Sequence, residues 1–106
     1  MAWFRRRPEF VQPSAVRDAF RTDREHLERF AQARVGVEAY IEPRTNVTQT
    51  TVMLIAHDGE WTRRRVETPE AARRWAHGLS IPVYDVALMG YPQRMRDYNA
   101  RRKTQA

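Results

Sequence analysis

The sequence predicts a single α+β domain: a helix, a three-stranded antiparallel sheet with an Asp-Gly hairpin, a second helix, a fourth strand and a C-terminal helix. Three observations predict this class. The chain has 106 residues, the usual size of one domain. The spacing of apolar residues changes from helical to alternating near Gly36. The pair Asp58-Gly59, between two strand-like runs, is typical of a hairpin turn, and Thr68-Pro69 is typical of a helix start.

The first helix is expected from residue 13 or 14 to about residue 34. Thr22 and Glu25 have the spacing of a capping box, and Asp23 interrupts the apolar stripe, so a kink or break near Thr22 is compatible with the pattern. Residues 1–12 have no helical or strand period, and we expect them to form an irregular basic and aromatic arm. The stripe itself has helical spacing and is assigned to the core: Val16, Phe20, Leu27, Phe30 and Ala31.

Three strands are expected after Gly36. Residues 35–42 alternate between apolar and polar side chains, and residues 50–56 are apolar on both faces, which favours a central strand. A two-residue type I′ turn at Asp58-Gly59 would return the chain as residues 60–66. That register pairs Ala56 with Trp61, Leu54 with Arg63 and Val52 with Arg65, and so places Trp61, Arg63 and Arg65 on one sheet face.

The remaining elements follow from cap and breaker residues. Thr68 is expected to cap a helix with Pro69 in its first position, and Gly78 and Pro82 should end it. Its buried stripe is expected to contain Ala72, Trp75, Ala76 and Leu79. Residues 83–89 are predicted to form the fourth strand, and a last helix should begin near Pro92. The expected organisation is an arm at 1–12, a domain at 13–90 and a basic helix and tail at 91–106.

The formal charge of +6 lies at the two ends of the chain. Residues 13–90 hold 11 Arg and 11 acidic residues, whereas residues 1–12 carry +2 and residues 91–106 carry +4. Eighteen of the 19 basic residues are Arg, whose planar fork matches phosphate oxygens. A genome rich in G and C also replaces Lys by Arg, and such a composition fits a bacterial protein. The position of the charge is therefore better evidence for a polyanionic partner than the type of base.

The sequence lacks the usual signs of catalysis, metal binding and membrane insertion. Its three histidines, His26, His57 and His77, have no ligand spacing, and no Gly-rich phosphate loop or nucleophile elbow is present. We expect no enzyme, no cofactor and no metal. The chain has no cysteine, no apolar run of about 20 residues and no secretory signal pattern, so we expect a cytoplasmic protein without a membrane partner.

We therefore expect a small non-enzymatic basic module that contacts nucleic acid or a nucleoprotein complex. The expected contacts are Arg5, Arg6, Arg7, Trp61, Arg63, Arg65, Arg94, Arg96, Arg101, Arg102 and Lys103. Trp61 has the alternative of belonging to the core. A second hypothesis is a protein–protein adaptor or a homo-oligomeric subunit, in which the aromatic arm or the last helix docks on a partner or a second copy. Its expected contacts are Trp3, Phe4, Phe10, Tyr91, Met95 and Tyr98.

Overall fold

A computed structural model of the chain describes residues 14–105 and confirms the α+β class. The elements, in chain order, are α2 (Ser14–Ala33), β1 (Glu38–Glu42), β2 (Thr51–Ile55), β3 (Trp61–Arg65), α3 (Pro69–Gly78), β4 (Val83–Asp85), α4 (Val86–Met89) and α5 (Gln93–Gln105). None of the helices between residues 14 and 105 is long and apolar enough to cross a membrane.

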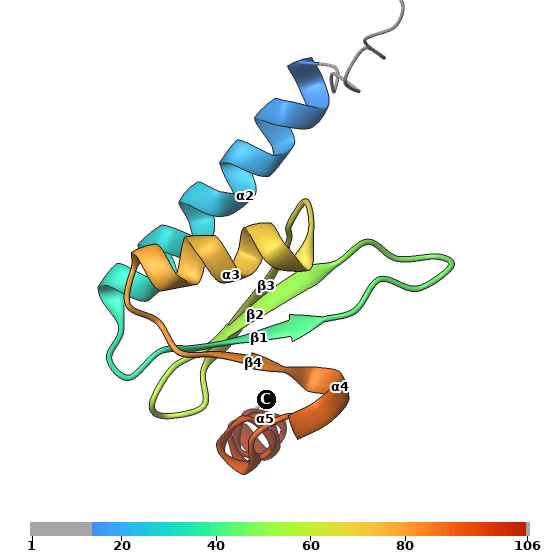
Figure 1. Cartoon of the computed structure of the whole chain (residues 1–106). Helices are drawn as coiled ribbons and strands as arrows, with labels where there is room; N and C mark the ends of the chain where they lie inside the picture. Colours follow the sequence, from blue (N-terminus) through green and yellow to red (C-terminus); the bar gives the residue numbers. More distant parts are fainter. Residues whose placement is uncertain (1–13, 106) are drawn as a thin grey trace, which may run out of the picture.

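The four strands form one mixed sheet in the order β3-β2-β1-β4. The pairs β1–β2 and β2–β3 are antiparallel, whereas β4 is parallel to β1 because the chain returns through α3. Helices α2 and α3 cover one face of the sheet, and α5 lies on the other face (Figure 1). Strand β2 is thus central and covered on both sides, which explains why it is apolar on both faces.

Two apolar clusters hold these layers together. The larger cluster lies between the sheet and the helices α2 and α3: Leu27, Phe30, Ala39, Ile41, Val52, Leu54, Ala56, Val66, Ala72, Ala76 and Ile81. The smaller cluster, on the α5 side, has a buried centre of Tyr40, Met53 and Ile55, and is covered by Trp61, Tyr84, Val86, Tyr91 and Met95. Apolar packing against the second face of the sheet therefore holds α5 on the domain.

The β2–β3 hairpin differs from the expected two-residue turn. Trp61 pairs with Ile55 and Arg63 pairs with Met53, one residue away from the predicted register. The amide of Ala56 donates to the Glu60 carbonyl (2.8 Å), and Gly59 has φ 94°, whereas Asp58 does not have a positive φ. Asp58 Oδ1 accepts from the Glu60 amide (3.0 Å), which stabilises a three-residue turn with Gly59 in the left-handed position.

In this register the side chains of Trp61 and Arg63 lie on the opposite sheet face from the one that the predicted register gave. A shift of one residue moves a side chain to the opposite face, so Trp61 and Arg63 lie with Met53 on the α5 side. The predicted partners Ala56, Leu54 and Val52 belong to the other cluster.

The predicted interruption of the first helix is also absent. Helix α2 continues through Thr22, whose Oγ1 donates to the Asp18 carbonyl (2.9 Å) instead of capping a new helix. Asp23 is buried but paired with Arg65 (3.2 Å) and Arg64 (3.7 Å), so a carboxylate fits within the apolar stripe. Val16 is 39% exposed because this end of α2 extends beyond the sheet (Figure 1).

The fourth strand is shorter than predicted. It ends at Asp85, whose Oδ1 accepts from the Ala87 amide (2.9 Å) and so starts the short helix α4 in place of the expected strand to residue 89. Leu88 and Met89, at the end of α4, are 83% and 65% exposed. A single capping side chain thus ends the pairing of β4 with β1.

Helix α3 begins as predicted and ends in a tight turn. Thr68 Oγ1 accepts from the Ala71 amide (3.0 Å), which confirms the cap. At the other end, the Ile81 amide donates to Ala76 O (2.9 Å) and the Ser80 amide to His77 O (3.0 Å), while Ser80 has φ 58°. Leu79, predicted to be buried, is 41% exposed because it lies past the last residue of the helix.

Replacing Ser80 with glycine is expected to raise the free energy of unfolding by about 0.5–1 kcal/mol, because glycine adopts a left-handed conformation without strain. Urea denaturation at constant pH measures this change. Ser80→Ala is the control, since alanine has a Cβ and should give no gain. A glycine variant less stable than the native chain would contradict a left-handed backbone at Ser80.

Candidate nucleic-acid interface

Three of the arginines expected to contact nucleic acid are neutralised by carboxylates of the chain itself. Arg63 donates to both oxygens of Glu42 (2.7 and 2.9 Å), and Arg65 pairs with Asp23 (3.2 Å). Arg94, in the first turn of α5, pairs with Glu38 (2.6 Å). These guanidinium groups already have a negative partner, so they add little net charge to the surface.

Glu42 is the centre of the strongest of these arrangements. It accepts hydrogen bonds from Arg63, from Thr51 Oγ1 (2.6 Å) and from the Tyr91 hydroxyl. Burial raises the pKa of Glu42, but the donors outweigh burial and hold this pKa below its ordinary value. Burial and the neighbouring Glu42 raise the pKa of Tyr91. The group joins β1, β2 and β3 to the segment before α5 and has a structural role.

Arg94 fastens the start of α5 to the hairpin. Besides its bond to Glu38, its side chain donates to the carbonyls of Ala56 (3.0 Å) and Ile55 (3.3 Å). Gly59 lies directly against this turn of helix, because a Cβ at Gly59 would overlap the Arg94 carbonyl oxygen and come within 2.8 Å of Tyr98 Cβ. The close approach fixes where α5 leaves the sheet.

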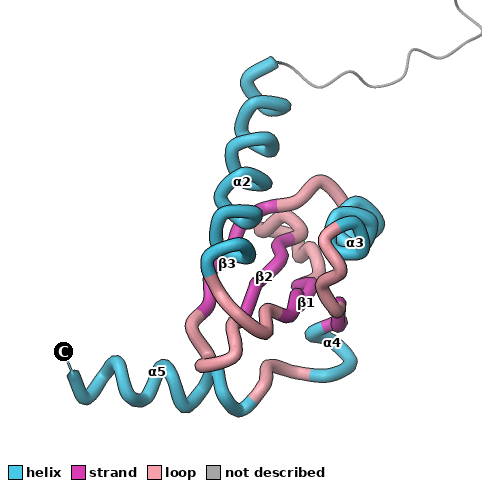
Figure 2. The backbone as a smooth tube through the Cα atoms, turned by 90° about the vertical axis from the view of Figure 1, so that its left-hand side faces the viewer, coloured by secondary structure: helices cyan, strands magenta, loops and turns pink. Residues whose placement is uncertain are grey.

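The other four basic residues of α5 form no ion pair in the part of the chain that the structure describes. Arg96 donates to the Tyr91 carbonyl (3.1 Å), and Arg101 to the Asp58 carbonyl (2.9 Å). Arg102 donates to the Tyr98 hydroxyl (3.2 Å). All four are exposed, and the end of α5 extends away from the sheet (Figure 2). We call this set the α5 cation cluster: Arg96, Arg101, Arg102 and Lys103.

The aromatic residues near the cluster are used by the domain itself. Trp61 packs on the smaller apolar cluster, its Nε1 donates to Asn99 Oδ1 (2.8 Å), and Arg63 lies over its ring at 5.3 Å. The guanidinium groups of Arg101 and Arg102 each lie 5.8 Å from the Tyr98 ring. Trp61 is therefore part of the domain core, as the alternative interpretation allowed.

The described residues that were expected to dock on a protein partner also pack against the domain itself. Tyr91 and Met95 pack against the chain's own smaller cluster, and Tyr98 lies half-buried beside Gly59. Other expected contacts lie outside the described residues: Trp3, Phe4, Arg5, Arg6, Arg7 and Phe10. The acidic residues Glu38 and Glu42 of β1 were a missed signal: Glu42 pairs with Arg63 across the intervening strand β2, and Glu38 pairs with Arg94 of α5.

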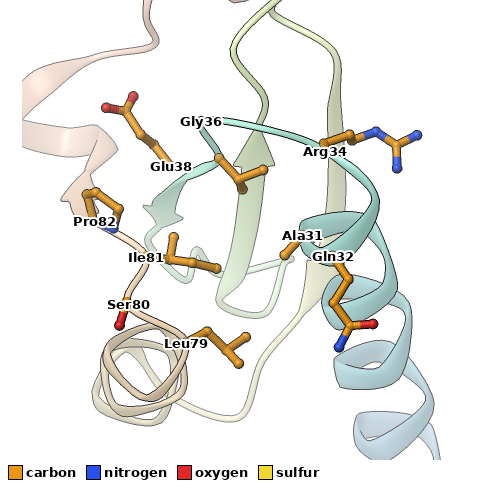
Figure 3. Close-up of a pocket in the computed structure, with 10 residues that line it drawn as sticks. Ala31, Gln32, Arg34, Gly36, Glu38, Leu79, Ser80, Ile81 and Pro82 are labelled. Atoms are coloured by element: carbon orange, nitrogen blue, oxygen red, sulfur yellow. The ribbon is translucent and has the colours of Figure 1, made fainter.

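A cleft of about 450 Å³ opens between the ends of α2 and α3 and the start of β1 (Figure 3). Leu79, Ile81 and Ala31 form its apolar wall. Its charged residues are already paired, Arg34 with Glu60 (2.7 Å) and Glu38 with Arg94. The cleft thus presents no unpaired acid or base for proton transfer.

Histidine and metal chemistry have little support among residues 14–105. His26 Nε2 lies 2.7 Å from Thr62 Oγ1, but its Nδ1 faces Arg64 (3.5 Å), and no carboxylate of the described residues is hydrogen-bonded to the ring. Burial and the charge of Arg64 lower the pKa of His26. Within this described part, no group of three or more His, Asp or Glu side chains could hold a metal ion.

No protein-family model matches the chain, and no curated protein or solved structure matches it significantly. The geometry of the described residues is therefore the basis for a functional proposal. Within it, the α5 cation cluster is the place where charge is concentrated without a carboxylate partner.

Proposed function

We propose that the protein is a small non-enzymatic module that binds nucleic acid, free or within a nucleoprotein complex, through its basic ends. Within the described residues, the proposed contact surface is the α5 cation cluster. One observation carries this proposal: within residues 14–105 none of the four cluster cations forms an ion pair, whereas the arginines of β3 pair with carboxylates. Phosphate groups would supply the missing negative charge.

The proposal divides the expected contact residues by role. Arg63, Arg65 and Arg94 hold the fold together through Glu42, Asp23 and Glu38. Moving one of these side chains to a phosphate would take an arginine partner away from a mostly buried carboxylate, at a cost in stability. Arg96, Arg101, Arg102 and Lys103 can turn to phosphate without that cost. The arginines at 5–7 are further proposed contacts at the other basic end.

Removing three cluster charges is expected to weaken nucleic-acid binding strongly. The variant combines Arg101→Gln, Arg102→Gln and Lys103→Gln, and the readout is the anisotropy of a labelled oligonucleotide at several salt concentrations. On duplex DNA each phosphate contact contributes about −0.9 to the slope of log affinity against log salt. The slope should therefore become less steep by about 2.7 for three contacts.

The matched control removes three charges from the body. Arg29, Arg44 and Arg74 are exposed and form no ion pair with any described residue. The combination of Arg29→Gln, Arg44→Gln and Arg74→Gln gives the same net charge as the α5 variant. The control should keep most of the native slope. Equal losses in the two variants would assign binding to overall charge instead of α5. A native protein that binds no nucleic acid at low salt would overturn the proposal.

A further inference from the structure

We infer that the ligand of the α5 cation cluster is duplex DNA, with the projecting end of α5 in the major groove. This inference rests on the proposed function and specifies the form of nucleic acid. Three features carry it. The cations point in different directions around the helix, the helix end extends beyond the sheet, and the aromatic rings of the described residues already pack against the domain itself.

The cations of the cluster point to different sides of α5. An α-helix has 3.6 residues per turn, so neighbouring residues lie about 100° apart around its axis. Arg101 and Lys103 are therefore on nearly opposite sides, with Arg102 between them. Cations on one side of a helix suit a single row of phosphates. Cations on opposite sides suit two rows, such as those that border a groove.

The end of α5 is free to enter such a groove. It extends beyond the edge of the sheet (Figure 2), and Arg101, Arg102 and Lys103 are all exposed. A helix with its side chains is about 10–12 Å across, and the major groove of B-DNA is about 12 Å wide. The major groove of an RNA duplex is deep and narrow and does not admit side chains in this way. The geometry therefore favours DNA over an RNA duplex.

Arg101 is placed so that it can reach a phosphate without leaving the hairpin. One of its terminal nitrogens donates to the Asp58 carbonyl (2.9 Å), which is neutral. A guanidinium has five N–H donors, so donors remain for a phosphate oxygen. This bond holds Arg101 beside the hairpin tip.

The aromatic residues favour a duplex over a single strand. Proteins that bind single strands stack unpaired bases on exposed aromatic rings. Between residues 14 and 104, no Phe, Trp or Tyr side chain is exposed. Trp61 is held by Asn99 and covered by Arg63, and Tyr98 is flanked by Arg101 and Arg102. For residues 14–104, this leaves phosphate contact without base stacking.

The test uses the full-length protein and five labelled probes of one mixed sequence: duplex DNA, the same duplex with bulky 5-substituted pyrimidines, each separated strand, and the RNA duplex. The DNA duplex is expected to bind on the order of tenfold more tightly than either strand or the RNA duplex at equal salt, because only it offers two phosphate rows at the right spacing. A DNA duplex whose pyrimidines carry bulky 5-substituents, which fill the major groove, should bind correspondingly less. A minor-groove drug should leave affinity unchanged.

The outcomes separate the inference from the proposed function. If no probe binds at low salt, both are overturned. If single strands or the RNA duplex bind as tightly as duplex DNA, and the triple α5 variant still loses that binding, only the duplex inference is overturned. If the minor-groove drug competes and the bulky substituents have no effect, the placement in the major groove is wrong. Thermal unfolding of each variant verifies that the domain remains folded.

Discussion

Gly59→Ala is expected to lower the free energy of unfolding by about 2–5 kcal/mol and to detach α5 from the hairpin. Two costs add. A non-glycine residue at φ 94° is strained by about 1–2 kcal/mol, and crowding of a packed position costs about 1–3 kcal/mol. The second cost cannot be relieved by rotating a side chain, because the new Cβ would overlap the backbone carbonyl of Arg94.

Urea denaturation followed by circular dichroism gives the change in stability, and tryptophan fluorescence reports the loss of the contact between Trp61 and Asn99. Gly78→Ala is the matched control. Gly78 is helical, nothing lies within 4 Å of an added Cβ, and alanine there should stabilise the domain by about 0.5–1 kcal/mol. Equal stability for the Gly59 variant and the native chain would contradict the close packing of α5.

Glu42→Gln is expected to lower the free energy of unfolding by about 2 kcal/mol at pH 7. The side chain of Glu42 is only 13% exposed, and the variant removes the charge that accepts from Arg63, Thr51 and Tyr91. Because Arg63 is 43% exposed, solvent screening keeps the effect below that of a fully buried pair. Chemical denaturation of the two proteins measures the difference.

The effect of Glu42→Gln should depend on pH with a definite sign. The pKa of Glu42 is lowered in the folded state, so the unfolded chain takes up a proton at higher pH than the folded chain does. The stabilisation is complete above the ordinary pKa of 4.5 and is lost as the pH falls through the lower folded pKa.

Glu25→Gln is the control for this series, since Glu25 is exposed on α2 and should change stability by less than about 0.5 kcal/mol. The two variants should therefore differ at pH 7 and converge in acid. A Glu42 variant that matches the Glu25 variant at every pH would show that the carboxylate contributes nothing to the fold.

The elements that could be predicted from sequence are those determined by nearby residues. The cap of α3 needs only Thr68, Pro69 and the Ala71 amide, all within four residues. The central position of β2 follows from its apolar residues on both faces. The hairpin was placed correctly, but its register was not, because an Asp58 side-chain bond changed the turn by one residue.

The candidate site was harder to predict, because distant partners decide which cations remain free. Arg63 and Glu42 are 21 residues apart, and Arg65 and Asp23 are 42 apart. The equal number of acidic and basic residues over 13–90 is visible in the sequence. Which acid pairs with which base depends on sheet register and helix packing. The excess of positive charge at residues 91–106 could be predicted from the sequence. The ion pair that neutralises Arg94 with Glu38 could not.

Because α5 is anchored on the β1–β3 region, the positions of its cations depend on the sheet being folded. A 13-residue helix with adjacent like charges is marginal by itself in water, and its anchors at Glu38, Ala56 and Asp58 come from separate parts of the β1–β3 region. The cluster thus has its fixed geometry only in molecules whose hairpin is complete. If nucleic acid is the ligand, as proposed, its apparent affinity should equal the intrinsic affinity multiplied by the fraction of chains with α5 in place, and binding would then report correct folding.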